Sequence, residues 1–448
     1  MIMAAQGSIL GNAVTRKEDP GLLTGANAYV DDLDIDSLRI VFVRSTMAHA
    51  SLLEVDTSEA INMPGVSAIY TSDNLNMDAV NQSEFMDPSM NRPPLAVDRV
   101  RFVGDIIAAV VAESHSQAVD AAEQIIIDYD PLPANADIET AIEEGTDILW
   151  EGAESNICFA IGNEYDGPDV NEAADTVVTE RIVTQRLAGV PMEPNGCVAI
   201  PEPGSMTFYA STQAAHGLRD GLAPNIGLEP ENLRVIAPWV GGGFGPKAGL
   251  YIEFILCAKA AQELNQPVKW TEQRGENMVS MAQGRAMVMN AELGVNKDGS
   301  IVGLKARVVA DAGAYPAIGA ILPMLTMQLS QAVYDIPAID FFAQSVVTNT
   351  TFTGAYRGAG RPEATQMVER ILDKAANAIG MDPAELRRKN YLQPDAFPLT
   401  TLVGANYDSG DYERSLDAAL EASGYKDLRA EQKRRRESDD PMLLGIGV

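Results

Sequence analysis

The alternation of apolar and polar positions divides the first part of the chain into short strands and helices. Apolar runs predict buried strands at Leu38–Arg44 and Val66–Thr71 and a long strand at Val100–Ala112. A helix is expected at Ser114–Gln124, with a further strand at Ile125–Tyr129. Because β and α segments alternate without a regular repeat, the pattern predicts a compact α+β unit over about the first 135 residues.

The pattern changes after this unit. The sequence over 136–167 is acidic and irregular, which is typical of a segment that crosses between domains. A second domain is therefore expected over 168–448. Within it, the apolar segments Arg285–Val295 and Ser300–Val309 flank an Asp-Gly turn, and this arrangement predicts a β-hairpin.

Two glycine-rich loops in the second domain each lie between a predicted strand and a predicted helix. The first is Trp239–Lys247, between the apolar segment Asn232–Pro238 and the helical pattern of Leu250–Ala261. Its glycines allow the backbone to approach a ligand and leave N–H groups free near a helix start. It lacks the closing Lys-Ser or Lys-Thr of a Walker loop and the GxGxxG spacing. The alternative is a tight turn that binds no ligand.

The second loop is Thr353–Glu363, and it carries Arg357 as a potential cationic fork. The two loops are expected to face one ligand, although Arg357 could equally pair with a carboxylate in a structural role. Gln213 lies at a third strand-to-helix junction, after the strand predicted at Met206–Ala210. Its carboxamide could offer a donor and an acceptor to a bound oxo or hydroxyl group, and a helix-capping role fits equally well.

Composition and charge limit the possible functions. With 448 residues, 46% of them apolar, the chain can form two or three domains with a large core. No apolar run reaches membrane-spanning length, and the N-terminus lacks the pattern of a secretory signal, so a soluble cytoplasmic protein is expected. A net charge of −30 argues against nucleic acid or an anionic membrane as partner. The basic cluster Lys433–Arg436 is expected to mark the solvated end of a helix.

Potential metal ligands are scarce and scattered. The cysteines and histidines are Cys158, Cys197, Cys257, His49, His115 and His216. The cysteines suit buried thiols, and the spacing fits neither a zinc nor an iron site. Any metal would therefore have to arrive inside a cofactor that brings its own ligands.

Several segments together resemble the molybdenum-cofactor-binding large subunit of the xanthine dehydrogenase/aldehyde oxidase family. They are STQ at 211–213, VGGGFGPK at 240–247, DAGAY at 311–315, TGAYRGAGRPEA at 353–364 and MDPAELRRKN at 381–390. The N-terminal segments VTRKEDPGLLTGANAYVDDL, FVRSTMAHASLLEVDTSEA, RFVGDIIAAVVAES and YDPLP are similar to the α/β hammerhead domain of that family. The resemblance implies a hammerhead domain over 1–135, a linker over 136–167 and the first half of the cofactor-binding domain over 168–448.

The resemblance also implies a site. The cofactor would be molybdopterin in its cytosine dinucleotide form, whose dithiolene holds the molybdenum, so that no side chain binds metal directly. The implied cofactor-binding residues are Gln213, Gly242, Gly243, Phe244, Gly245 and Arg357, and the implied substrate-pocket residues are Phe244, Ala248 and Gly358. Gln213 would approach the oxo ligand of the metal, and Arg357 would lie beside it.

Three departures from the family pattern bear on the reaction. Copper-containing carbon monoxide dehydrogenases have a cysteine where this chain has Gly358, and purine-oxidising members have a glutamate where it has Ala248. The glutamate that acts as base in the family would lie beyond Val448, so no catalytic residue is predicted in this chain. The acids Glu193, Glu253 and Glu363 match no motif that would replace it.

The predicted function is the N-terminal half of the molybdopterin-binding subunit of a molybdenum hydroxylase. This oxidoreductase would act on an aldehyde or an N-heteroaromatic carbon with water as oxygen donor, and the isolated fragment would be inactive. Iron–sulfur and FAD partner subunits would carry the electrons away, and a C-terminal half, on the same or another chain, would complete the subunit. The alternative is a non-catalytic structural or assembly half of a split subunit.

Overall fold

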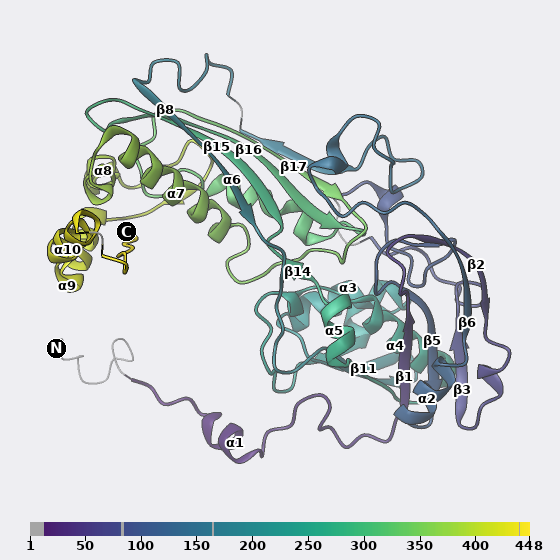
Figure 1. Ribbon diagram of the computed structural model, residues 1–448. Coiled ribbons are helices and arrows are strands. Elements are labelled where there is room, and N and C mark those ends of the chain that lie inside the picture. Colours follow the sequence, from purple (N-terminus) through teal and green to yellow (C-terminus); the bar gives the residue numbers. More distant parts are fainter. Residues whose placement is uncertain (1–12, 82–84, 164, 439) are drawn as a thin grey trace.

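The computed structural model describes residues 13–81, 85–163, 165–438 and 440–448 (Figure 1). The strands are β1 (Leu38–Arg44), β2 (Ala50–Asp56), β3 (Val66–Tyr70), β4 (Arg99–Val100), β5 (Ile106–Ala112), β6 (Ile126–Pro131), β7 (Ile157–Gly162), β8 (Thr176–Thr184), β9 (Leu187–Ala188), β10 (Gly196–Glu202), β11 (Ser205–Ala210), β12 (Leu233–Ile236), β13 (Val268–Thr271), β14 (Gln283–Gly284), β15 (Met287–Val295), β16 (Ile301–Gly313), β17 (Ile339–Val347), β18 (Leu399–Thr400) and β19 (Asn406–Tyr407). The α-helices are α1 (Asp19–Thr24), α2 (His115–Ala122), α3 (Ala215–Asn225), α4 (Ile252–Leu264), α5 (Arg274–Ser280), α6 (Leu322–Gln328), α7 (Arg361–Ile379), α8 (Pro383–Lys389), α9 (Tyr412–Ser423) and α10 (Tyr425–Glu437). The α+β class predicted from the sequence is confirmed.

One sheet combines strands from distant parts of the chain. Its order is β12-β11-β10-β13-β1-β5-β3, and β1 pairs in parallel with β13, with Leu38 opposite Val268. Every residue of β5 is buried, because α2 covers one face of this part of the sheet and the main core covers the other. The sheet therefore includes strands from both sides of the linker expected at 136–167. The domain boundaries themselves stay a prediction.

The second large sheet has the order β7-β17-β16-β15-β8. Figure 1 shows it in a different half of the molecule from the first sheet, with α7 lying across one of its faces. Met367, Ile371 and Leu372 of α7 are buried against Met289 and Leu293 of β15. The predicted hairpin is confirmed as β15 and β16.

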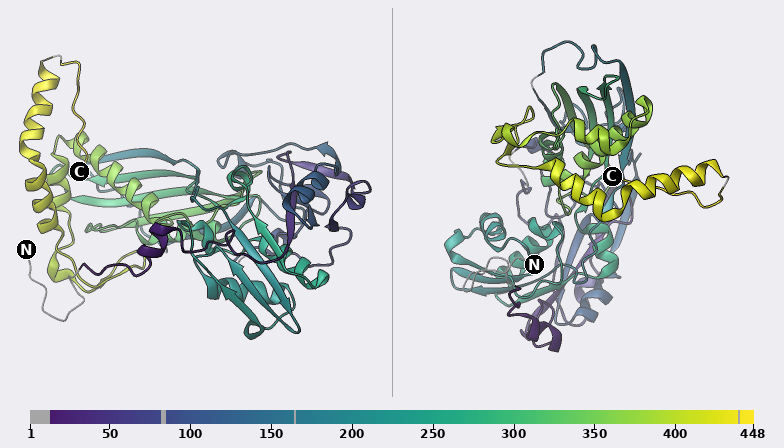
Figure 2. Two further views of the ribbon diagram at one scale, coloured as in Figure 1. Left: turned by 90° about the horizontal axis from the view of Figure 1, so that it is seen from below. Right: turned by 90° about the vertical axis from the view of Figure 1, so that its left-hand side faces the viewer.

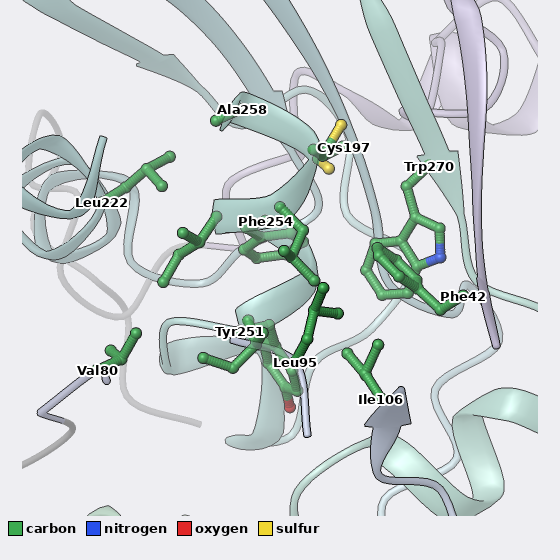
Figure 3. Packing of buried hydrophobic residues seen from close by; sticks show 14 of the residues in the cluster. Phe42, Val80, Leu95, Ile106, Cys197, Leu222, Tyr251, Phe254, Ala258 and Trp270 are labelled. Carbon is green, nitrogen blue, oxygen red and sulfur yellow. The ribbon is translucent and has the colours of Figure 1, made fainter. Parts of the chain in front are cut away.

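The main hydrophobic core lies between the first sheet and α4. Figure 3 shows Trp270 of β13 packed beside Phe42 of β1 and close to Phe254 of α4. The ring centroids of Trp270 are 5.6 Å from those of Phe42 and 6.0 Å from those of Phe254, both in edge-to-face arrangements. Cys197 is buried in the same cluster, and all three cysteines are free buried thiols, as expected.

Some predicted elements differ from the structure. The long strand expected at Val100–Ala112 is divided into β4 and β5. Gly104 has a φ of +110°, and the Asp105 carboxylate accepts a hydrogen bond from the N–H of Arg101, which closes a turn between the two strands. Strand β10 was not predicted, and of helix α10 only its basic end was expected.

The C-terminal helices α9 and α10 project away from the sheets, beyond α8 (Figure 2). The basic cluster Lys433–Arg436 lies near the end of α10 and is largely exposed, as expected. Across the described ranges, no helix combines the length and the apolar character needed to cross a lipid bilayer.

Candidate functional site

The two glycine-rich loops lie against each other. The first connects β12 to the short helical turn before α4, and the second connects β17 to α7. The N–H of Arg357 in the second loop donates to the carbonyl oxygen of Phe244 in the first, at 2.8 Å. Gly245 has a φ of +109°, and a Cβ added there would stand 2.4 Å from the carbonyl oxygen of Ala355. Glycine at this position therefore permits the contact between the loops.

The first loop presents a row of peptide N–H groups. The N–H of Gly241 donates to Glu193, and the N–H of Gly245 donates to Gln213. Among the described residues, the N–H groups of Gly242, Gly243 and Phe244 have no hydrogen-bond acceptor. Positive φ angles occur in this row, +96° at Gly242 and +56° at Phe244. Consecutive free N–H groups in such a turn form a concavity that binds electronegative groups.

Gln213 lies between β11 and α3, as predicted. Its side-chain oxygen accepts the hydrogen bond from Gly245 at 2.8 Å, which leaves its NH₂ group as the donor for a ligand. A Cβ at Gly243 would stand 2.3 Å from that oxygen, so this glycine lets the loop lie close to the amide. The helix-capping alternative is wrong, because α3 begins after Ala214 and has no side-chain cap.

The side chain of Arg357 is exposed. Within the described part of the chain it forms no ion pair with a carboxylate, so the alternative of a paired structural arginine is not observed. The next residue, Gly358, has a φ of +97°, and a Cβ there would stand 2.4 Å from the ring of Pro362. A cysteine at 358 would therefore require this turn to rearrange.

A cavity of about 260 Å³ lies beside the two loops. Its lining is mainly apolar and includes Ala248, Tyr251 and Phe352. Of the residues expected in the substrate pocket, only Ala248 lines this cavity. Phe244 and Gly358 lie outside it, and the side chain of Phe244 is 44% exposed on the surface of the loop.

Glu193 joins three segments behind the first loop. Its carboxylate accepts hydrogen bonds from the N–H of Gly241 at 2.7 Å and the hydroxyl of Ser211 at 2.6 Å, and it pairs with Lys247 at 3.1 Å. The Lys247 side chain is fully buried and also donates to Ser211 and to the carbonyl oxygen of Glu193. Burial lowers the pKa of Lys247, although the Glu193 carboxylate opposes this shift. This cluster holds the first loop in place.

The other two candidate acids are also bound to cations. Glu253 accepts a hydrogen bond from Arg44 at 2.7 Å, and Glu363 lies 3.3 Å from Arg285. Both glutamates are 1% exposed. These pairings favour the structural interpretation over acid–base chemistry, and the absence of a catalytic base from this chain stays a prediction.

Sequence reasoning missed two groups near the loops. Burial raises the pKa of Glu272 to about 7, while hydrogen bonds from the N–H of Asn195 and the amide of Asn277 oppose this shift. Arg285 was seen only as the start of a predicted strand, yet it contacts the second loop. Glu272 lies in the polar segment TEQRGE at 271–276, so no local sequence signal could have indicated its burial.

His49 and His115 have surroundings outside the two loops. His49 Nδ1 is 2.6 Å from the carbonyl oxygen of Pro133, and burial lowers the pKa of the imidazole. His115 is the first residue of α2. Where the structure describes the chain, no group of three or more potential metal ligands is present.

Two family models match the chain. Residues 150–391 match the molybdopterin cofactor-binding domain, and residues 24–133 match the a/b hammerhead domain of aldehyde oxidase and xanthine dehydrogenase. Together the matched segments contain β1 to β17 and both glycine-rich loops.

Individual relatives are similar over nearly the whole chain. Subunit gamma of the 6-hydroxypseudooxynicotine dehydrogenase complex of Paenarthrobacter nicotinovorans is 35% identical over 458 residues, which cover 98% of this chain and 57% of that protein. The crystal structure of a Cu,Mo-CO dehydrogenase superposes with a TM-score of 0.89 at 34% identity, covering 96% of this chain and 56% of that one. The chain thus spans a little over half the length of these relatives.

One relative is about as long as this chain. The nicotinate dehydrogenase large molybdopterin subunit of Eubacterium barkeri is 29% identical over 428 residues, which cover 94% of this chain and 99% of that protein. A molybdopterin subunit of about the length of the present chain therefore occurs in nature.

Proposed function

Because this chain belongs to the xanthine dehydrogenase/aldehyde oxidase family of molybdopterin-binding oxidoreductase subunits, we propose that it forms the N-terminal half of the cofactor-binding subunit of a molybdenum hydroxylase. The observation that carries this proposal is the row of unpaired N–H groups at Gly242, Gly243 and Phe244, next to the oriented amide of Gln213. These donors suit the electronegative atoms of a molybdopterin.

Each loop residue has a proposed part in holding the cofactor. The N–H groups of Gly242, Gly243 and Phe244 would donate to it, Gln213 would present its NH₂ group, and Arg357 would supply a cation. When bound, the molybdenum cofactor supplies the two-electron redox chemistry that the side chains of this chain lack. The cytosine dinucleotide form is part of the same proposal.

We propose an aldehyde or an N-heteroaromatic carbon as the site of oxidation, with water as oxygen donor. The apolar, aromatic lining of the cavity at Tyr251 and Phe352 suits a planar substrate. Relatives named for 6-hydroxypseudooxynicotine and nicotinate, the second a pyridine, support this class. Ala248 lines the cavity at the position where a purine oxidase has glutamate, so a purine is not proposed. Gly358 packs against Pro362 at the position where a copper-binding cysteine would be needed, so carbon monoxide is not proposed.

We propose three kinds of partner: iron–sulfur and FAD subunits, and a C-terminal half on the same or a separate chain. The relatives that are almost twice as long support a second half within one polypeptide. The relative of matching length supports a separate chain. On either arrangement, the fragment of 448 residues would not turn over alone.

Cofactor content of the assembled protein tests the proposal. The chain would be coexpressed with the C-terminal half and the partner subunits encoded beside it, and molybdenum and pterin would be measured in the purified complex. We expect about one of each per chain. A folded complex that contains neither would contradict the proposal and support the alternative of a structural or assembly half.

A further inference from the structure

Arg285 has an unfavourable backbone conformation beside the second loop. It follows β14 directly, and its φ is +65°; that of the next residue, Ala286, is +61°. Residues with a Cβ rarely adopt such angles, and two in succession persist only where the surrounding structure holds them. Such positions concentrate at functional sites, which makes the contacts of the Arg285 side chain worth tracing.

The guanidinium of Arg285 binds the backbone of the second loop at two consecutive residues. It donates to the carbonyl oxygen of Arg357 at 2.6 Å and to that of Tyr356 at 3.2 Å, and it lies 4.9 Å from the centre of the Tyr356 ring. It also lies 3.3 Å from the buried carboxylate of Glu363 in the first turn of α7. The planar fork of an arginine can make these contacts at once, whereas the single ammonium of a lysine cannot.

These contacts reach the first loop through one residue. Arg285 holds the carbonyl oxygen of Arg357, while the N–H of Arg357 donates to the carbonyl oxygen of Phe244. Arg357 is therefore fixed from both sides. The close approach of β14 supports the same arrangement, since a Cβ at Gly284 would stand 2.2 Å from the Cβ of Tyr356.

We propose that Arg285 is a positioning residue that fixes the second loop against the first and so sets the direction of the free N–H groups and of the Arg357 side chain. The inference rests on the proposed function, because these are the groups that would hold molybdopterin. Arg285 need not touch the cofactor itself. Its role is to hold two loops in one relative position before any ligand binds.

Hydrogen exchange of the full 448-residue chain, without cofactor, tests the positioning role. In Arg285→Gln we expect the hydrogen-bonded amides of Arg357 and Ala359 in the second loop and of Gly241 and Gly245 in the first to exchange about tenfold faster, because the charged hydrogen bonds that close the loops are lost. Amides of α4 should exchange as in the unchanged protein. Arg285→Lys should restore protection only in part. The matched control is Arg370→Gln, an exposed arginine of α7 that pairs with Glu180 at 2.7 Å, and it should leave both loops unchanged.

Two outcomes would overturn the inference. One is that a folded Arg285→Gln protein keeps both loops protected; the other is that exchange accelerates equally in α4, which indicates general destabilisation. If the glutamine variant does not fold, Arg285→Gly replaces it, because glycine accepts the positive φ while still removing the guanidinium. The same acceleration in the loops is then expected.

The cofactor content of the complex is a separate measurement. If the unchanged complex holds no molybdenum but Arg285→Gln still loosens the loops, the proposed function fails and the positioning role stands. If the complex holds molybdenum and the loops of Arg285→Gln stay protected, the positioning role fails and the proposed function stands. Both hold if Arg285→Gln loosens the loops and also lowers the molybdenum content of the complex.

Discussion

Glu272 leads to a prediction about stability and pH. Its carboxyl group is 2% exposed and accepts hydrogen bonds from the N–H of Asn195 at 2.7 Å, the amide of Asn277 at 2.7 Å and the hydroxyl of Ser280 at 3.0 Å. Burial raises its pKa from 4.5 to about 7. We expect Glu272→Gln to remove this titration while keeping the contacts, because the glutamine oxygen can accept from Asn195 and Asn277 and its NH₂ group can donate to Ser280.

The sign follows from the direction of the shift. A carboxyl group whose pKa is raised in the folded state binds its proton more tightly there than in the unfolded chain. Its contribution to stability is fully present below pH 4.5 and is lost as the pH rises through about 7. The difference between the two pKa values corresponds to about 3 kcal/mol in the free energy of unfolding. As the pH rises over this range, the free energy of unfolding of Glu272→Gln should therefore increase relative to that of the unchanged protein.

Urea unfolding of both proteins at several pH values between 4.5 and 8 measures this difference. The difference in unfolding free energy, Glu272→Gln minus the unchanged protein, should increase by about 3 kcal/mol in favour of the variant between pH 4.5 and pH 8. Parallel curves would refute the reasoning, because they would show that the carboxyl group titrates alike in the folded and unfolded states.

Two further predictions concern the first loop. Gly245→Ala should lower both the midpoint of thermal unfolding and the molybdenum content of the complex, because its Cβ would stand 2.4 Å from the carbonyl oxygen of Ala355. Gly249→Ala is the control for the unfolding midpoint, because a Cβ there meets nothing within 4 Å. Lys247→Met should destabilise the protein by about 3–5 kcal/mol in urea unfolding, because it leaves the Glu193 carboxylate without its buried cation. Adding Glu193→Gln to Lys247→Met should cost less than the sum of the single changes, and strict additivity would show that the pair does not interact.

The parts of the site visible in the sequence are those with local signals. Glycines between a strand and a helix indicated both loops, and the end of a strand at Ala210 placed Gln213 correctly. What the sequence could not show is which segments meet. The pairing of Lys247 with Glu193 and the hydrogen bond from Arg285 to Arg357 join segments far apart in the chain, so no local pattern records them.

The fold shows the same division. Continuous apolar runs gave β1 with its observed bounds, because a buried strand has a local signature. The prediction of one long strand at Val100–Ala112 was wrong, because Gly104 interrupts it with a positive φ that apolar character alone does not indicate. The parallel pairing of β1 with β13 depends on the tertiary fold and carries no sequence signal of its own.

That parallel pairing has a consequence for biosynthesis. On the ribosome, β1 emerges early, but the start of one of its edges, at Leu38 and Arg39, has no pairing partner until β13 has been made. The unpaired N–H and C=O groups of such an edge can form hydrogen bonds with strands of other chains. A chain arrested before Val268 would expose this edge, and an excised hammerhead region would carry it permanently. Production of the first region alone is thus expected to yield aggregates, whereas any piece that extends through Thr271 includes the strand that covers it.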